Sequence, residues 1–382
     1  MDTSNIFISL NNICNKYHIY LVLIALVVIQ LFWYFIFGVK NGGDSGFYLK
    51  GGTQLLTEGL PGFSNFKMYL KITYISFISA HLYFSDNINY IIFSQVVLHI
   101  ASSLILWGII KKYCSDFSAF ILICLFSFFP YLSRWNFYIL SESIAVSLSI
   151  ITVWIAYKIY TERMFDILYF IPVIIVISLV RPHTSFIVFG LLLFYIYFKK
   201  SGNNLSKINV LNFLLIIFVI TYVVFSFNPE VFIGSIEKLN KLYASGQIIA
   251  GAWYLDPASN HKDSSAFMSI YSVAKLGVLR VLSEIFMVRS YYSLLNNMHL
   301  ILYAFIIYGL SITSFFSKKH NSFKLALLFM IFGNYFLIAI TFASWDGRFS
   351  LYVLPQLWVL MALGVGLIEV KLNYNTNGSG SV

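Results

Sequence analysis

The chain has 382 residues, of which 59% are hydrophobic and only 10% are charged, and its formal net charge is +10. A mean hydropathy of +0.81 excludes a water-soluble domain, because a chain with so few charged residues cannot cover its apolar surface with polar groups. The balance indicates an integral membrane protein, and its positive charge is explained by basic loops beside a membrane better than by nucleic acid.

Apolar runs long enough to span a bilayer recur along the chain, since a membrane helix needs about 20 apolar residues to cross about 30 Å of hydrocarbon. The first run lacks a small-residue cleavage site and is followed by others, which predicts a retained span instead of a signal peptide. We predict about ten spans, the third, fifth and sixth of them short: 19–38, 88–110, 117–131, 139–157, 165–180, 184–198, 208–227, 298–316, 323–342 and 351–368. The predicted fold is an all-α polytopic membrane protein.

Basic residues in the short loops predict the orientation, because Lys and Arg concentrate on the cytoplasmic side. They occupy alternate connections, at Lys111 and Lys112, Lys158 and Arg163, Lys199 and Lys200, and Lys318 and Lys319. This pattern predicts a cytoplasmic N-terminus at 1–18, a transmembrane domain at 19–368 and a disordered, Gly/Ser-rich cytoplasmic tail at 369–382. The long segments 39–87 and 228–297 then face outwards.

The cysteines and histidines predict neither disulfides nor a metal site. Cys14 and Cys114 fall on the predicted cytoplasmic side, Cys124 falls inside a span, and the outer segments contain none. The histidines stand singly, without the Cys/His spacing that zinc sites use. We therefore expect no metal ion held by histidines.

The outer segments contain amphipathic stretches. Residues 59–86 alternate apolar and polar positions with a helical period, but the run is too short to count as a span, which predicts an interfacial helix. Segment 228–297 contains the polar stretch YLDPASNHKDSSAF and a second amphipathic piece near 273–287. Both segments are expected to lie over the outer face of the bundle.

Ionisable residues from different segments gather on the predicted outer face. They are Asp44, Arg134, Glu142, Arg181, His183, Asp346 and Arg348. Charges at a membrane boundary are costly unless they are paired or used, so a cluster of both signs predicts a functional site. The alternative for each arginine is a helix-end residue whose side chain snorkels to the headgroups.

Glu142 is the most informative member of this cluster, because it opens an apolar span in YLSRWNFYILSESIAVSLSI with only serines as polar neighbours. A carboxylate removed from water needs a charged or hydrogen-bonding partner. Arg134, which precedes it across a short turn, is a candidate partner. Near the end of the chain, Asp346 and Arg348 lie in TFASWDGRFSLYVLPQLW, where Gly347 lets the backbone bend before the last span.

Four stretches together resemble a known family. GDSGFYLKGG after the first span, YILSESIAVSL at the start of a middle span, and LVRPHTSFIVFGLLLF and WDGRFSLYVLPQLWVL further on look like motifs of the glycosyltransferase C (GT-C) superfamily, in the same order. Its members use polyprenyl-phosphate sugars and include aminoarabinose transferases, protein O-mannosyltransferases and O-antigen-modifying transferases. The resemblance covers 19–368 and implies a GT-C-like bundle with amphipathic interfacial helices in the first outer loop.

The resemblance implies a role for the acid that follows the first span. In such enzymes this residue is the candidate general base, and here it is Asp44, with Glu142 and Asp346 as further acidic candidates. A positioned carboxylate that removes the proton of an acceptor hydroxyl contributes about 10²- to 10⁴-fold to the rate. The alternative is a solvated Asp in an ordinary Gly-rich turn, because Gly42 and Gly43 precede it.

The arginines suit the leaving group of that reaction. A lipid-linked sugar phosphate departs as a phosphate monoester, and a planar guanidinium binds its growing negative charge through paired hydrogen bonds. We expect Arg348, Arg181 and Arg134 to bind the donor phosphate. The residues expected in the substrate cavity are Tyr48, His183, Trp345 and Tyr352. A divalent cation shares this task in some members of the family, but no set of ligands here demands one.

The expected function is an inverting membrane glycosyltransferase that moves a hexose or pentose from undecaprenyl phosphate to a surface glycan, such as the O-antigen of lipopolysaccharide, or to a lipid-linked acceptor. Segment 228–297 is expected to contact that acceptor, and no nucleic-acid partner is expected. A composition rich in Ile, Phe, Tyr, Asn and Lys suggests a bacterial gene. The resemblance then implies the bacterial inner membrane, with the active site facing the periplasm and both termini in the cytoplasm.

Two other functions stay open at this point. One is an O-antigen polymerase, a class that typically pairs arginines in two large outer loops. The other is a transporter or flippase for a lipid-linked sugar, which is expected to place its ionisable residues near the bilayer midplane instead of at one rim.

Overall fold

The structure is a computed structural model, and it describes residues 3–63, 66–162, 167–202, 278, 281–282, 284–286, 293–340 and 350–378. Within these ranges the chain is helical, and the single pairing of extended backbone is an isolated bridge between Lys40 and Tyr138. The all-α class is therefore confirmed. The predicted span at 208–227 lies outside the described residues, as does the C-terminal end of the predicted tail at 379–382.

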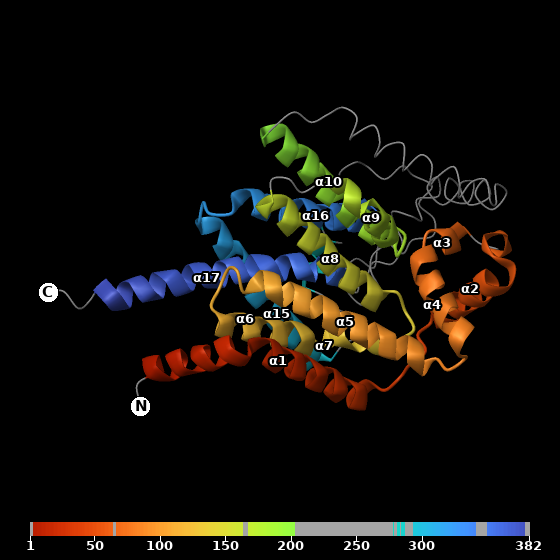
Figure 1. The fold of residues 1–382 in the computed structure, drawn as a ribbon, viewed down its shortest axis with the longest axis horizontal. Helices are drawn as coiled ribbons and strands as arrows, with labels where there is room; N and C mark the ends of the chain where they lie inside the picture. The colour runs from red at the N-terminus through yellow and green to blue at the C-terminus, as the bar shows by residue number, and fades with distance from the viewer. Residues whose placement is uncertain are drawn as a thin grey trace.

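The described helices form a bundle with a small helical cap. The bundle helices are α1 Thr3–Phe37, α5 Asn89–Ile110, α6 Asp116–Phe128, α7 Pro130–Ser133, α8 Glu142–Thr161, α9 Ile171–Ser178, α10 Pro182–Gly202, α15 Leu294–Thr313, α16 Asn321–Ile340 and α17 Leu354–Gly378. The cap consists of α2 Ser45–Glu58, α3 Phe66–Tyr69 and α4 Ile72–Phe84. Figure 1 shows the cap at one end of the bundle, whereas the start of α1 and the end of α17 lie at the other end. Which end faces the cytoplasm stays a prediction.

Six described helices are long and apolar enough to cross a membrane. They are Ile19–Phe37, Asn89–Ile110, Glu142–Thr161, Asn297–Phe316, Asn321–Ala339 and Ser350–Leu372, and they match the first, second, fourth, eighth, ninth and tenth predicted spans. The fifth and sixth predicted spans contain the shorter α9 and the apolar part of α10. The membrane class is thus supported by these helices, and the total of ten stays a prediction.

The third predicted span is broken. Asp116–Phe128 and Pro130–Phe137 are long and apolar enough to cross a membrane only when they are taken together, and the angle between them is 53°. Pro130 explains the break, because a proline disfavours helical backbone at the preceding residue and removes one backbone donor. Phe129 accordingly adopts an extended conformation, with φ −63° and ψ 112°. The bend turns the chain before the start of α8.

Burial distinguishes the central helix from the peripheral one. In the apolar stretch that includes α17, 83% of the residues are buried, whereas in the apolar stretch of α1 only 22% are buried. The exposed positions of α1 are large and apolar, for example Ile24, Leu31 and Phe35. Such a face suits lipid, because lipid tails solvate apolar side chains that water does not. We infer that α17 is the core of the bundle and that α1 lies at its edge.

Helices α10 and α16 cross through a reciprocal pair of glycines. A Cβ at Gly190 would lie 2.4 Å from the backbone oxygen of Phe329, and a Cβ at Gly333 would lie 2.5 Å from that of Phe186. Both contacts involve backbone atoms, which cannot rotate away as a side chain does. Small residues allow two membrane helices to approach this closely. The crossing therefore fixes α16 against the start of α10.

Gly333→Leu should destabilise the protein strongly, because the new side chain must push the two helix backbones apart and overpacking costs about 1–3 kcal/mol or more. The matched control is Gly309→Leu on α15, since a Cβ at Gly309 meets nothing within 4 Å. Thermal unfolding in detergent should show a large loss for the first variant and little for the second. Equal midpoints for both variants would contradict the close crossing.

Candidate functional site

The beginning of segment 39–87, the first segment predicted to face outwards, folds back onto the chain that leads into α8. The backbone N–H of Lys40 donates to the Phe137 oxygen at 2.9 Å, and the Ser45 hydroxyl donates to the Ile139 oxygen at 3.1 Å. The backbone N–H of Gly42 donates to the Ser45 hydroxyl at 2.8 Å. A Cβ at Gly42 would lie 2.9 Å from Leu140 Cδ1, so a larger residue would require the Leu140 side chain to shift where the two segments meet. These contacts fix the start of α2 beside the start of α8.

Asp44 lies at the N-cap position of α2, immediately before Ser45. Its side chain is exposed and makes no capping hydrogen bond, whereas its backbone oxygen accepts from the Tyr48 N–H at 3.2 Å. An aspartate at this position usually caps the helix with its carboxylate. The backbone of Asp44 is therefore hydrogen-bonded to α2, whereas its carboxylate does not cap the helix. Its role as general base stays a prediction.

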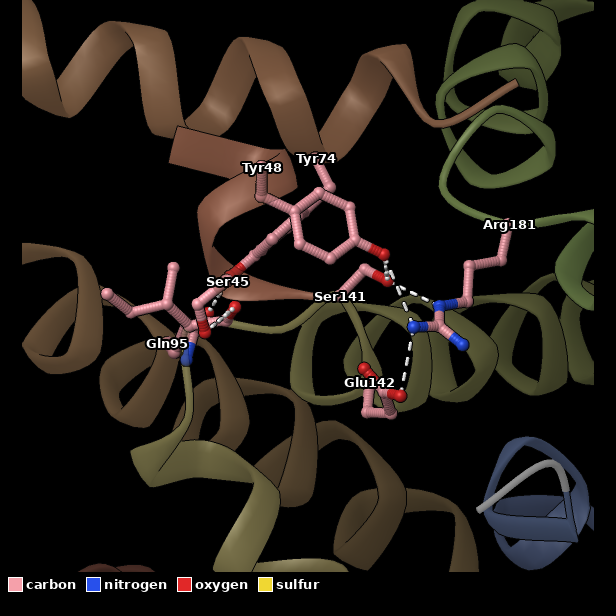
Figure 2. Close-up of polar contacts among 8 residues, drawn as sticks. Ser45, Tyr48, Tyr74, Gln95, Ser141, Glu142 and Arg181 are labelled. Carbon is pink, nitrogen blue, oxygen red and sulfur yellow. Dashed lines mark hydrogen bonds and ion pairs between the residues drawn. The ribbon is translucent and has the colours of Figure 1, made fainter. Parts of the chain in front are cut away.

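A buried ion pair contacts Tyr48, which follows Asp44 by one turn of α2. Glu142 is 0% exposed and Arg181 is 4% exposed, and Nη2 of the arginine lies 2.9 Å from Oε1 of the glutamate. Nη2 also donates to the Tyr48 hydroxyl at 3.2 Å, and Nε donates to the Ser141 hydroxyl. The Tyr48 and Ser141 hydroxyls are themselves hydrogen-bonded, with their oxygens 2.9 Å apart. Figure 2 shows how these side chains converge. The site therefore joins α2, the start of α8 and the turn between α9 and α10.

Electrostatics keep Arg181 charged. Burial lowers the pKa of its guanidinium, but Glu142 and the hydroxyls of Tyr352 and Tyr48 outweigh this effect and hold the pKa well above its ordinary value. The positive charge is therefore present and is balanced by the neighbouring carboxylate. An anionic substrate at this site needs a further cation, since a paired arginine contributes less net attraction than a free one.

Tyr48 connects the ion pair to the helical cap. Its ring packs edge-on against Tyr74 of α4, with centroids 4.7 Å apart, and the Nζ of Lys71 lies 4.9 Å from the same ring centroid. The Tyr74 hydroxyl donates to Gln95 Oε1 at 2.7 Å. The Gln95 amide in turn donates to the Tyr138 oxygen at 2.9 Å. Two hydrogen-bonded groups, joined by the packing of the Tyr48 and Tyr74 rings, thus link α2, α4 and α5 to the chain before α8.

Sequence analysis missed the supporting members of these two groups. Ser141 was visible only as a neighbour of Glu142, and Tyr74 and Gln95 carry no local signal because they matter only once α4 and α5 pack together. Lys71 precedes α4 and stands over the Phe47 and Tyr48 rings. A basic residue in the first outer segment was not considered a site residue.

Two further expected residues lie close to the pair. His183 is 7% exposed, its Nδ1 lies 3.2 Å from Asn334 Oδ1, and its ring centroid is 5.7 Å from that of Tyr352. Tyr352 belongs to η6, Ser350–Val353, which precedes α17, and is fully buried. The structure thus brings Tyr48, His183 and Tyr352 together with Glu142 and Arg181, although the sequence separates them widely.

Arg134 occupies a different setting. Its guanidinium carbon lies 4.7 Å from the ring centroid of Tyr131 and 4.4 Å from that of Trp135. The sequence named it as a candidate partner of Glu142, whereas the ion pair that the structure shows at Glu142 is formed by Arg181. Trp345, Asp346 and Arg348 lie in 341–349, outside the described residues.

The described site pairs one guanidinium with one carboxylate and surrounds them with hydroxyl groups. Among the described residues, no group of three or more His, Cys, Asp or Glu side chains lies close enough to hold a metal ion. A divalent cation therefore stays an implication of the resemblance alone. Comparisons with family models, with curated proteins and with solved structures found no match for this chain.

Proposed function

We propose that this membrane protein is an inverting glycosyltransferase that takes a sugar from a polyprenyl phosphate, undecaprenyl phosphate in a bacterial inner membrane, and adds it to a glycan or lipid-linked acceptor on the outer side. One observation carries most of the proposal. The buried Glu142–Arg181 pair is joined through Tyr48 to α2, the helix that begins directly after the exposed Asp44. Charged groups buried in a membrane bundle are costly and are commonly kept for function.

The reaction assigns each group a task. Asp44 accepts the proton of the acceptor hydroxyl. At the same time the oxygen of that hydroxyl attacks the sugar carbon that is bonded to the phosphate. The bond between that carbon and the phosphate oxygen breaks, and the lipid phosphate leaves as a monoester. The configuration at the sugar carbon is thereby inverted. Protein cations beside the phosphate stabilise the charge that grows on it.

Lys71 joins Arg181 and Arg348 as a proposed phosphate-binding residue. Its Nζ stands beside the aromatic ring whose hydroxyl contacts Arg181, and the ion pairs found among the described residues do not include it. It therefore contributes net positive charge where the charge of Arg181 is balanced by Glu142. A lysine binds phosphate as a point charge, which complements the planar fork of an arginine.

The proposed activity can be tested directly. The purified protein, in detergent or nanodiscs, is incubated with a panel of hexoses and pentoses on undecaprenyl phosphate and with glycan or lipid-linked acceptors. Release of undecaprenyl phosphate together with an acceptor heavier by one sugar would support the proposal. If no donor of the panel is consumed and free undecaprenyl phosphate does not bind, the proposed function is wrong.

Tyr48→Phe should lower turnover about 10- to 150-fold, because a hydrogen bond to a charged group contributes about 1.5–3 kcal/mol and 1.4 kcal/mol corresponds to a factor of ten. The variant keeps the ring that packs on Tyr74 and removes only the hydroxyl that contacts Arg181 and Ser141. Tyr74→Phe is the matched control, since its hydroxyl bonds Gln95. Equal losses in both variants would remove the special role of Tyr48.

A further inference from the structure

The Arg181 cluster comprises Glu142, Arg181, Tyr48, His183 and Tyr352. A second buried carboxylate, besides that of Glu142, belongs to Glu284. Glu284 is 1% exposed and belongs to 284–286, a short described stretch of the predicted outer segment 228–297. Sequence analysis did not single it out, because it lies in an amphipathic stretch where an acid is expected on the polar face. A carboxylate that is withdrawn from water is costly unless it is bound and used.

Glu284 holds the first residue of η6. The Ser350 hydroxyl donates to the backbone oxygen of Glu284 at 2.8 Å and lies 3.0 Å from its Oε2. Ser350 is itself 0% exposed, so water does not compete for these bonds. The contact joins the predicted outer segment to the turn that begins α17.

Two tyrosines extend this second cluster. The hydroxyl of Tyr308 on α15 is hydrogen-bonded to that of Tyr335 on α16, and Ser350 lies close to Tyr335. Both tyrosines interact electrostatically with Glu284. The residue before Tyr335 is Asn334, which contacts His183. Helix α16 therefore contacts Tyr308 through Tyr335, and it contacts His183 of the Arg181 cluster through the preceding residue, Asn334.

The other side of η6 faces the candidate site. Tyr352 follows Ser350 by two positions, its ring packs beside His183, and its hydroxyl adds to the electrostatic field at Arg181. The Ser149 hydroxyl of α8 donates to the Tyr352 backbone oxygen. The short turn η6 thus carries one residue of each cluster, and a displacement of Ser350 must also displace Tyr352.

We propose that Glu284 is a positioning residue that holds Ser350, and thereby keeps Tyr352 in place against Arg181 and His183. The inference rests on the proposed glycosyltransferase function, since it gives Glu284 a task in that same site. Because Glu284 belongs to the segment expected to contact the acceptor, the contact also connects the acceptor side of the site to its donor-phosphate side.

The test compares Ser350→Ala and Glu284→Ala with a matched control, Ser311→Ala. Ser311 is also a buried serine whose hydroxyl donates to the backbone of α17, at Leu357 O and 3.0 Å, but it lies away from η6. Two measurements are made on each purified protein: sugar transfer at saturating donor, and hydrogen–deuterium exchange of the 350–353 amides. Glu284→Gln is the conservative variant, because its amide oxygen still accepts from Ser350.

We expect faster exchange at 350–353 and a turnover that is about 10- to 100-fold lower for Ser350→Ala, which loses both contacts, since small misplacements in an active site cost up to about 100-fold. Glu284→Ala should change both in the same direction but less, because the backbone oxygen of residue 284 still accepts from Ser350. Glu284→Gln should recover part of both, and Ser311→Ala should match the unsubstituted protein. Unchanged exchange at 350–353 would overturn the hold on η6. Faster exchange with full turnover would overturn its positioning role. If the unsubstituted protein transfers no sugar, the proposed function fails, while the exchange data still decide whether Glu284 holds η6.

Discussion

Glu142→Gln is expected to destabilise the protein by about 3–5 kcal/mol, because removal of one partner leaves the other charge buried and uncompensated. The substitution keeps the shape of the side chain and removes the charge that lies 2.9 Å from the Arg181 guanidinium. Arg181→Gln should cause a loss of similar size. The midpoint of thermal unfolding in detergent, measured at one detergent and lipid concentration, gives the comparison.

The paired replacement Glu142→Leu with Arg181→Met separates stability from function. Replacing both members of a buried ion pair with apolar residues of similar volume is often neutral or stabilising, so the double variant should recover most of the lost stability. It should nevertheless be inactive, since the proposed site loses both charges. A double variant that transfers sugar normally would assign the pair to structure alone.

An exposed ion pair supplies the control for this experiment. Lys158 and Glu162 form an i,i+4 pair whose side chains are 30% and 50% exposed. Solvent screening limits such pairs to about 0–1 kcal/mol, so Glu162→Gln should shift the midpoint little. A loss for Glu142→Gln no larger than for Glu162→Gln would contradict the importance of burial at the site.

Asp44→Asn is expected to lower turnover by about 10²- to 10⁴-fold, the contribution of a positioned general base. Folding should be retained, because the Asp44 side chain is exposed and makes no capping hydrogen bond. Binding of undecaprenyl phosphate should also be retained, since the base acts on the acceptor. Transfer assays at saturating donor, together with lipid-binding measurements on the same preparation, distinguish these effects.

Asp86→Asn is the matched control for Asp44→Asn. Asp86 is an exposed acid of the same predicted outer segment and lies after α4. Its substitution should leave transfer intact. Near-normal turnover in well-folded Asp44→Asn would move the base elsewhere, with Glu142 and Asp346 as the next candidates to replace.

The sequence allowed prediction of the helical membrane class and of the need for a partner at Glu142, because apolar run length and an isolated acid in an apolar run are local features. It did not reveal which arginine forms the pair. Arg181 lies in the turn before α10, and only the packing of α9 and α10 on α8 brings it to Glu142. Local sequence instead favoured Arg134, which stacks on aromatic rings.

Other differences have equally specific causes. Pro130 marks the break of the third predicted span in the sequence itself, whereas the length of the apolar run alone predicts a continuous span. The contacts of Glu284 and Asn334 had no local signal, because each depends on side chains that lie more than 60 residues away. Hydrophobic patterning predicts that a helix is buried, but it does not predict which polar side chains meet between helices.

The long-range contacts at Tyr48 constrain the order in which the protein assembles during synthesis. Tyr48 lies 93 residues before Ser141 and 133 residues before Arg181. At about 5–20 residues per second, the ribosome adds the arginine about 7–27 s after the tyrosine. Until Ser141 has been added, α2 lacks the contacts that fix it beside α8, and Glu142 enters the membrane before the cation that compensates it. A nascent chain that stops between α8 and α10 therefore presents an uncompensated carboxylate in the bilayer, which is costly.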